Sequence, residues 1–163
     1  MSQEETSKPQ KARLISEIVL FSALSGIGAM IPVPSPVGSV ALDSFPGYFM
    51  ALWRGAASGA LVSAVGHLLS SLRAGFPLGY LHIPVALLMA LVGAVTALVK
   101  RKFGVVAGLA TGVTINTAGV VLAIPTMGWG IIPILTPILF AASLINAAAA
   151  GIAYGAINKV IKG

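Results

Sequence analysis

The sequence predicts an all-α integral membrane protein, a bundle of six transmembrane helices with both termini on the cytoplasmic side. Hydrophobic residues make up 57% of the 163 residues and charged residues only 9%, whereas soluble domains carry about 25% charged residues. A soluble protein of this size must cover most of its surface with polar groups. This chain lacks them, so we expect a lipid bilayer to cover it instead.

Six apolar segments follow one another, separated by proline, glycine and basic residues. A helix needs about 20 apolar residues to cross a bilayer, and fewer when its neighbours shelter it. We expect spans at residues 15–31, 45–53, 55–72, 78–99, 103–124 and 134–157. Residues 1–14 form an N-terminal cytoplasmic tail and residues 15–163 a single membrane domain. Residues 32–44 and 125–133 are predicted loops, because their prolines remove backbone donors and end a helix.

The basic residues test this division, because they lie at the ends of the apolar segments. With the N-terminus inside and six spans, nine of the ten lysines and arginines fall on the cytoplasmic side and only Arg73 lies outside; the nine are Lys8, Lys11, Arg13, Arg54, Lys100, Arg101, Lys102, Lys159 and Lys162. Cytoplasmic loops of membrane proteins are enriched in such residues. Spans two and three could also be read as one long kinked helix, but that would place residues 100–102 outside.

Motifs of catalysis are missing from the sequence. There is no cysteine, no G-x-x-x-x-G-K-[ST] nucleotide loop, no H-E-x-x-H zinc motif and no G-x-S-x-G nucleophile motif. Only two histidines and four carboxylates are present. We therefore expect no enzyme activity, no metal and no cofactor. The net charge of +6 is spread along the chain, so we expect no nucleic-acid partner.

Small residues recur at helical spacing on two of the spans. Gly55, Gly59 and Ser63 lead to His67 on the third span, and three glycines lead in the same way to Asn116 on the fifth. Small faces let helices pack closely in a membrane, and packing alone would explain them. His67 and Asn116 each lie about 18 Å from the cytoplasmic end of their helices, at 1.5 Å per residue. Asn146 on the last span reaches a similar depth.

Buried polar groups in a membrane need partners, so a cluster of them is a candidate binding site. The simpler alternative is hydrogen bonding between helices. The outer connections add Asp43, Tyr48, His82 and Trp129 to the candidates. The predicted substrate-binding residues are therefore Asp43, Tyr48, His67, His82, Asn116, Trp129 and Asn146. As alternatives, Trp129 could mark the membrane interface, and Asp43 could pair with Arg73.

The pattern of short spans, a proline-rich first outer loop, a very short second span and small-residue helix faces resembles an S-component. This is the substrate-binding membrane subunit of energy-coupling-factor (ECF) vitamin importers. Members carry Ala-x-x-x-Ala on the first helix for docking; here that place holds Ser22-Ala23-Leu24-Ser25-Gly26. The resemblance implies a bacterial cytoplasmic membrane protein whose partners are a T-component, docking on Ser22 and Gly26, and two ATPase subunits.

The stretches Phe45-Pro46-Gly47-Tyr48-Phe49 and Gly75-Phe76-Pro77-Leu78-Gly79 resemble S-components for α-ribazole, the dimethylbenzimidazole riboside. The resemblance implies that Trp129 or a neighbouring aromatic stacks on the base and that Asp43, His67 and Asn116 hold the ribose. Riboflavin, thiamin, pantothenate and queuosine precursors are alternative substrates.

Three other classes remain open. A carrier driven by an ion gradient would carry buried carboxylates and inverted repeats, whereas Glu17 lies near the start of the first span. A membrane scaffold or assembly protein would bind no small molecule tightly. A membrane enzyme would need more acid–base groups than this chain carries.

Overall fold

The structure, a computed structural model, describes the backbone of residues 3–162 and the side chains of residues 10–161. Over that range the chain is all-α, which confirms the predicted class, and its only strand-like pairing is an isolated bridge between Pro32 and Ala41. The α-helices are α1 (Gln3–Ala29), α2 (Phe45–Arg54), α3 (Ala56–Arg73), α4 (His82–Phe103), α5 (Val105–Ala118), α6 (Ile124–Met127) and α7 (Ile131–Lys162). Two 3-10 helices, η1 (Gly79–Leu81) and η2 (Gly119–Ala123), precede α4 and follow α5.

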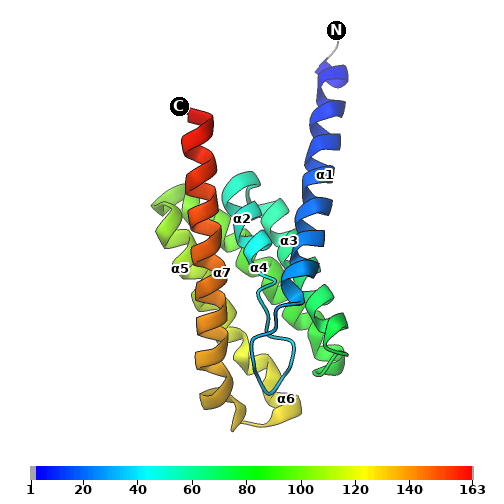
Figure 1. The fold of residues 1–163 in the computed structure, drawn as a ribbon, viewed down its shortest axis with the longest axis vertical. Helices are drawn as coiled ribbons and strands as arrows, with labels where there is room; N and C mark the ends of the chain where they lie inside the picture. The colour runs from blue at the N-terminus through cyan, green and yellow to red at the C-terminus, as the bar shows by residue number, and fades with distance from the viewer. Residues whose placement is uncertain (1–2, 163) are drawn as a thin grey trace.

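The helices form one bundle with both termini at the same end (Figure 1). Helix α3 packs against α1, α2 and α4, helix α5 packs against α4 and α7, and α2 also contacts α7. Helix α6 and the connection into α7 lie at the opposite end of the bundle (Figure 1). The chain therefore reverses direction repeatedly along one axis, as a membrane bundle must.

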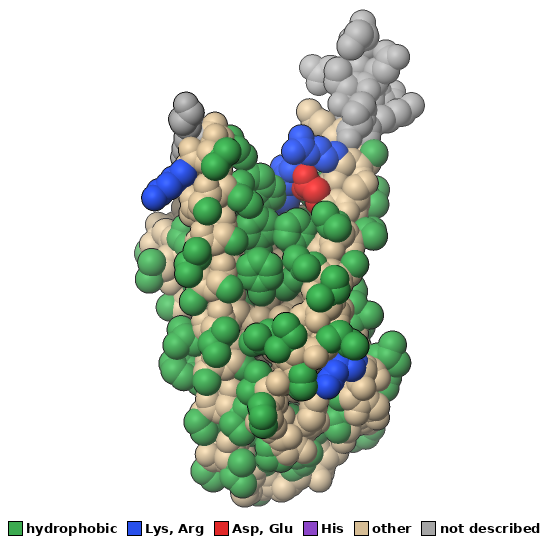
Figure 2. All heavy atoms as spheres, in the orientation of Figure 1, with side chains coloured by type: hydrophobic (Ala, Val, Ile, Leu, Met, Phe, Trp, Pro, Cys, Tyr) green, Lys and Arg blue, Asp and Glu red, His purple; other side chains and the backbone are tan. Residues whose placement is uncertain are grey.

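Four helical segments are long and apolar enough to cross a membrane: Gln10–Ala29, Gly79–Phe103, Val105–Met127 and Ile131–Ile161. With 10 residues, α2 is too short to span a bilayer alone. Large apolar side chains are widely exposed; Val106 is 83% exposed and Ile152 is 74% exposed. Apolar side chains are spread over the whole face in Figure 2. The chain is a membrane-embedded protein.

The second and third predicted spans are separate helices, as expected. Helix α2 ends at Arg54 and α3 begins at Ala56, and Gly55 between them has φ +97°. Only glycine adopts this backbone conformation without a steric penalty, so the residue sharply reverses the chain. Gly104, with φ +89°, makes the same kind of turn between α4 and α5.

The small-residue faces bring helix backbones together. A Cβ added at Gly59 would lie 2.6 Å from the Ala51 Cβ on α2, and one added at Gly112 would lie 2.7 Å from the Tyr48 ring. Gly93 on α4, which belongs to none of the predicted faces, lies against the backbone of α3 at Gly59. Close backbone approach is thus the packing mode of this bundle.

One predicted boundary is wrong. Residues 125–133 are not a continuous loop, because α6 extends to Met127 and α7 begins at Ile131. Pro133 is tolerated in the first turn of α7, where a backbone N–H needs no partner within the helix. The fifth predicted span, residues 103–124, corresponds to the apolar segment Val105–Met127, which is built from α5, η2 and α6 in succession. Residues 3–14 of the predicted tail belong to α1.

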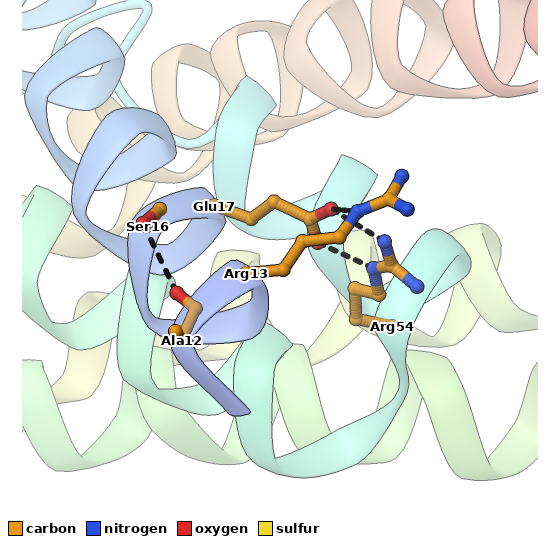
Figure 3. A network of polar contacts seen from close by, with 5 residues as sticks. All are labelled: Ala12, Arg13, Ser16, Glu17 and Arg54. Carbon is orange, nitrogen blue, oxygen red and sulfur yellow. Dashed lines mark hydrogen bonds and ion pairs between the residues drawn. The ribbon is translucent and has the colours of Figure 1, made fainter. Parts of the chain in front are cut away.

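Basic residues tie the helices together at the end that carries the termini. Arg13 donates from Nε to Glu17 Oε1 over 3.1 Å, and Arg54 at the end of α2 donates two bonds to the same carboxylate (Figure 3). Lys100 Nζ donates to the Leu52 carbonyl over 3.1 Å. On the face shown in Figure 2, Lys and Arg side chains gather near this end. The side chains of Lys8 and Lys162 lie outside the described residues.

Candidate ligand-binding cavity

A cavity lies within the half of the bundle away from the termini. Its volume is about 680 Å³, including the open space at its mouth. The walls come from the loop before α2, from the connection between α3 and η1, and from α3, α4, α5, η2 and α7. They are Val37, Ser39, Val40, Ala41, Asp43, Ser44, His67, Leu78, Val85, Leu88, Met89, Asn116, Gly119, Val120, Ala123, Leu135, Leu139, Ala142, Ser143 and Asn146.

Four of the seven predicted binding residues line this cavity. Asp43 comes from the loop before α2, His67 from α3, Asn116 from α5 and Asn146 from α7. They are separated by up to 103 positions in sequence, counted from Asp43 to Asn146. The fold therefore brings polar groups of four different segments to one apolar-walled space.

Asp43 is the acidic group of the cavity. It is 7% exposed, and the Ser44 hydroxyl donates to its Oδ1 over 3.2 Å. Burial raises the pKa of the Asp43 carboxyl to about 7, because a low-dielectric surrounding disfavours the charged form. It does not pair with Arg73: the ion pairs found among the described side chains join Arg13 and Arg54 to Glu17.

The loop that carries Asp43 is held by glycines on the neighbouring helices. A Cβ at Gly66 of α3 would lie 3.3 Å from the Asp43 carbonyl oxygen, and one at Gly28 of α1 would lie 3.2 Å from the Asp43 Cα. The Ser70 hydroxyl donates to the Ser39 carbonyl over 2.9 Å. The loop is thus packed into the bundle between α1 and α3, which places its carboxyl group at the cavity.

His67 and His82 form a relay with Ser71 at the side of the cavity. The Leu78 N–H donates to His82 Nε2 over 3.2 Å, so the proton of the neutral His82 ring resides on Nδ1. That Nδ1 lies 2.7 Å from the Ser71 Oγ and 3.2 Å from His67 Nε2. The Ser71 hydroxyl donates to the His67 carbonyl over 2.8 Å.

This geometry fixes the His67 ring as well. A proton on His67 Nε2 would face the proton on His82 Nδ1 across 3.2 Å, so His67 Nε2 acts as an acceptor. The His67 proton therefore lies on Nδ1, for which the described residues offer no hydrogen-bond partner. The lining residue His67 is therefore a neutral ring that carries one N–H.

Asn146 and Tyr48 support the cavity from within the bundle. The Asn146 Oδ1 accepts the Phe45 N–H over 2.8 Å, and its Nδ2 donates to the Ala142 carbonyl over 2.8 Å. The amide is therefore engaged in holding the start of α2. The Tyr48 hydroxyl lies 2.7 Å from the Ser143 Oγ, and the residue is 1% exposed. Asn146 thus positions the start of α2, and Tyr48 contacts the lining residue Ser143.

Three predicted binding residues lie outside the lining: Tyr48, which contacts Ser143 as described above, His82 and Trp129. His82 is 1% exposed and reaches the cavity only through His67. Trp129 is 76% exposed, in the turn between α6 and α7, and does not line the cavity. The stacking role expected of Trp129 therefore has no support in its position. Phe76 packs edge-on against His82 with ring centroids 5.6 Å apart, on the outer side of the relay.

Sequence reasoning missed the apolar wall. On α7, Leu135, Leu139, Ala142 and Asn146 recur three or four residues apart and all line the cavity. This spacing places them on one helix face. Positions three or four residues apart before Asn146 would have identified this face from the sequence. The contribution of η2, through Val120, had no such signal.

The predicted docking residues lie on α1. Ser22 and Gly26 are both half-buried. A Cβ added at Gly26 would lie 3.4 Å from the Leu69 Cδ1 on α3. Gly26 therefore packs within the chain, and a bulky substitution there would also disturb the contact between α1 and α3.

The cavity offers a carboxyl group, an amide, an imidazole N–H and a broad apolar wall. These groups suit the binding of a small molecule that is partly apolar and carries hydroxyl or amino groups. Among the described residues, no group of three or more His, Cys, Asp or Glu side chains is placed to hold a metal ion. Comparison of the chain with family models, with curated proteins and with solved structures found no match.

Proposed function

We propose that this chain is a substrate-binding membrane subunit that captures a small molecule in the cavity. One observation carries the proposal. Asp43, His67 and Asn116 come from three separate segments, yet all line one apolar-walled cavity in the half of the bundle away from the termini. Buried polar groups that converge in a membrane protein are costly unless they serve a ligand or each other.

We further propose six spans with both termini in the cytoplasm of a bacterial cell. The short α2 and α3 would complete the bundle beside the four long apolar segments. Arg54, at the end of α2, bonds to Glu17 on α1 at the end that carries the termini, which supports α2 as a returning pass. The basic residues at that end favour its cytoplasmic placement.

Reporter fusions test this topology. Fusions after Lys102 should report the cytoplasm, and fusions near Gly38, Gly75 and Gly128 should report the outside. An outside signal at Lys102 would rule out six spans.

The proposed class is an S-component of an ECF importer, which works with a T-component and two ATPase subunits. The cavity on the non-cytoplasmic side of the proposed topology supports a role in capture from outside. Copurification tests the class: the chain should be recovered with a T-component and both ATPases from membranes that contain them. Recovery of the chain alone, together with no binding of any vitamin, would favour a scaffold.

For the substrate we propose α-ribazole first, with riboflavin, thiamin and pantothenate as alternatives. Its flat base would lie on the apolar wall, and its ribose hydroxyls would meet Asp43, His67 and Asn116. Calorimetry on the detergent-purified protein tests this. The riboside should bind more tightly than the bare base, because leaving the polar groups unpaired costs about 1–3 kcal/mol each.

Two variants make the calorimetry specific to the cavity. Asn116→Ala should weaken binding by about ten- to a hundredfold, since it removes a polar group of the lining. Trp129→Ala is the matched control, because Trp129 is exposed and outside the lining, and its affinity should stay unchanged. An equal loss in both variants would contradict the assignment of the site.

A further inference from the structure

The charges around the cavity restrict what it can bind, if it is the ligand site of the proposed function. Asp43 is the one acidic residue of the lining, and the lining contains neither lysine nor arginine. Among the residues that the structure describes, the cavity therefore presents a carboxyl group and no fixed positive charge. Most of the remaining lining side chains are aliphatic.

The arginine and lysine residues outside the lining do not supply the missing positive charge. Arg54 is bound to Glu17 at the end that carries the termini, and Lys100 donates to the Leu52 carbonyl. Arg73 is exposed at the end of α3 and does not belong to the cavity lining.

Among the described side chains of the lining, His67 is the one left that could become a cation. Its Nε2 accepts a hydrogen bond from His82, whose own Nε2 is occupied by the Leu78 N–H. Protonating His67 would set two N–H groups against each other across 3.2 Å. The relay therefore holds His67 as a neutral donor.

An anionic ligand would thus lose its hydration in an apolar-walled space without a cation to replace it. Burial of an unpaired charge is among the most costly events in a protein. A ligand with a hydroxyl, amino or cationic group instead meets the Asp43 carboxyl, whose oxygens accept hydrogen bonds and whose charged form a nearby cation favours.

We propose that the cavity selects uncharged or cationic ligands and rejects phosphorylated or carboxylated ones. Of the candidate substrates, α-ribazole, thiamin and riboflavin carry no anionic group and are compatible with this selectivity. Pantothenate carries a carboxylate and is excluded by it. It also means that the protein takes up the free nucleoside or vitamin and not its phosphate ester.

Calorimetry with matched pairs tests this on the purified full-length protein. The probes are α-ribazole with its 5′-phosphate, thiamin with thiamin monophosphate, and riboflavin with flavin mononucleotide, together with pantothenate. In the pair that binds, the unphosphorylated member should bind at least about tenfold more tightly. Equal or tighter binding of a phosphorylated member, or binding of pantothenate, would overturn the inference while leaving the proposed function standing. No binding of any probe would overturn both.

Two substitutions connect the selectivity to the charge of the cavity. Asp43→Asn should weaken the preferred member by about ten- to a hundredfold and reduce the discrimination against its phosphate. Asn116→Lys adds a cation to the lining and should improve the phosphorylated member relative to the unphosphorylated one, whereas the uncharged control Asn116→Gln should not. Each variant is first checked for a wild-type elution profile and unfolding temperature. If properly folded Asn116→Lys and Asn116→Gln discriminated alike, the missing cation would not be the cause, and the inference would fall.

Discussion

Gly93 lies where α4 crosses α3, and replacing it by alanine is the most direct test of the packing. A Cβ at this position would lie 2.7 Å from the Ala60 nitrogen and closer still to the Gly59 carbonyl group. These are backbone atoms of a helix, so no side-chain rotation relieves the clash. Since favourable contacts of carbon atoms lie at about 3.5–4.0 Å, the two helices must separate by about 1 Å.

The cost follows from this overlap. Overpacking typically costs about 1–3 kcal/mol, and contact with rigid backbone places Gly93→Ala at about 3 kcal/mol. Alanine returns about 1 kcal/mol through its higher helix propensity. The free energy of unfolding should therefore fall by about 2 kcal/mol. Ligand affinity should fall too, because Met89, one turn away on α4, lines the cavity opposite residues of other helices.

Unfolding in detergent micelles measures the effect, with Gly155→Ala as the matched control. An added Cβ at Gly155 on α7 meets nothing within 4 Å, so this variant should unfold like the wild type or up to about 1 kcal/mol later. If Gly93→Ala were as stable as Gly155→Ala, the close approach of α3 and α4 would be refuted.

Three further predictions concern the polar groups around the cavity. Asn146→Ala leaves the Phe45 N–H without its acceptor, so the free energy of unfolding should fall by about 1–3 kcal/mol; an unchanged value would remove the support role of Asn146. Burial raises the pKa of Asp43 from 3.8 to about 7. The folded chain then keeps a proton that the unfolded chain releases, so stability should fall as the pH rises from about 4 to about 8, and Asp43→Asn should flatten this slope in an unfolding series. Nitrogen-15 NMR of the histidine rings should show both His67 and His82 neutral at about pH 7, each with its proton on Nδ1; a proton on Nε2 of either ring would contradict the relay.

Much of the fold could be predicted because it depends on local chemistry. Prolines at positions 32, 34 and 36 end the first helix, and Gly55 separates two helices that might have been one. The predicted bounds of α2 and α3 agree with the observed ones to within one residue, because a glycine between two apolar segments is a local signal. The end of α5 and the start of α7 could not be predicted in this way. Proline is compatible with the first turn of a helix, so Pro133 did not exclude an earlier start of α7, and the 3-10 continuation of α5 depends on the neighbouring helices.

The sequence by itself determined that this chain is a membrane-embedded helical protein and which side chains are polar groups within apolar segments. Composition and hydropathy are sums over residues, so they need no knowledge of contacts. The tertiary structure alone decided which polar groups meet. It brought Asp43, His67 and Asn116 together, turned Asn146 into a support for α2 and left Trp129 on the surface. The physical reason is distance: a hydrogen bond or cavity wall forms between residues far apart in sequence, and only the packing of helices sets that separation.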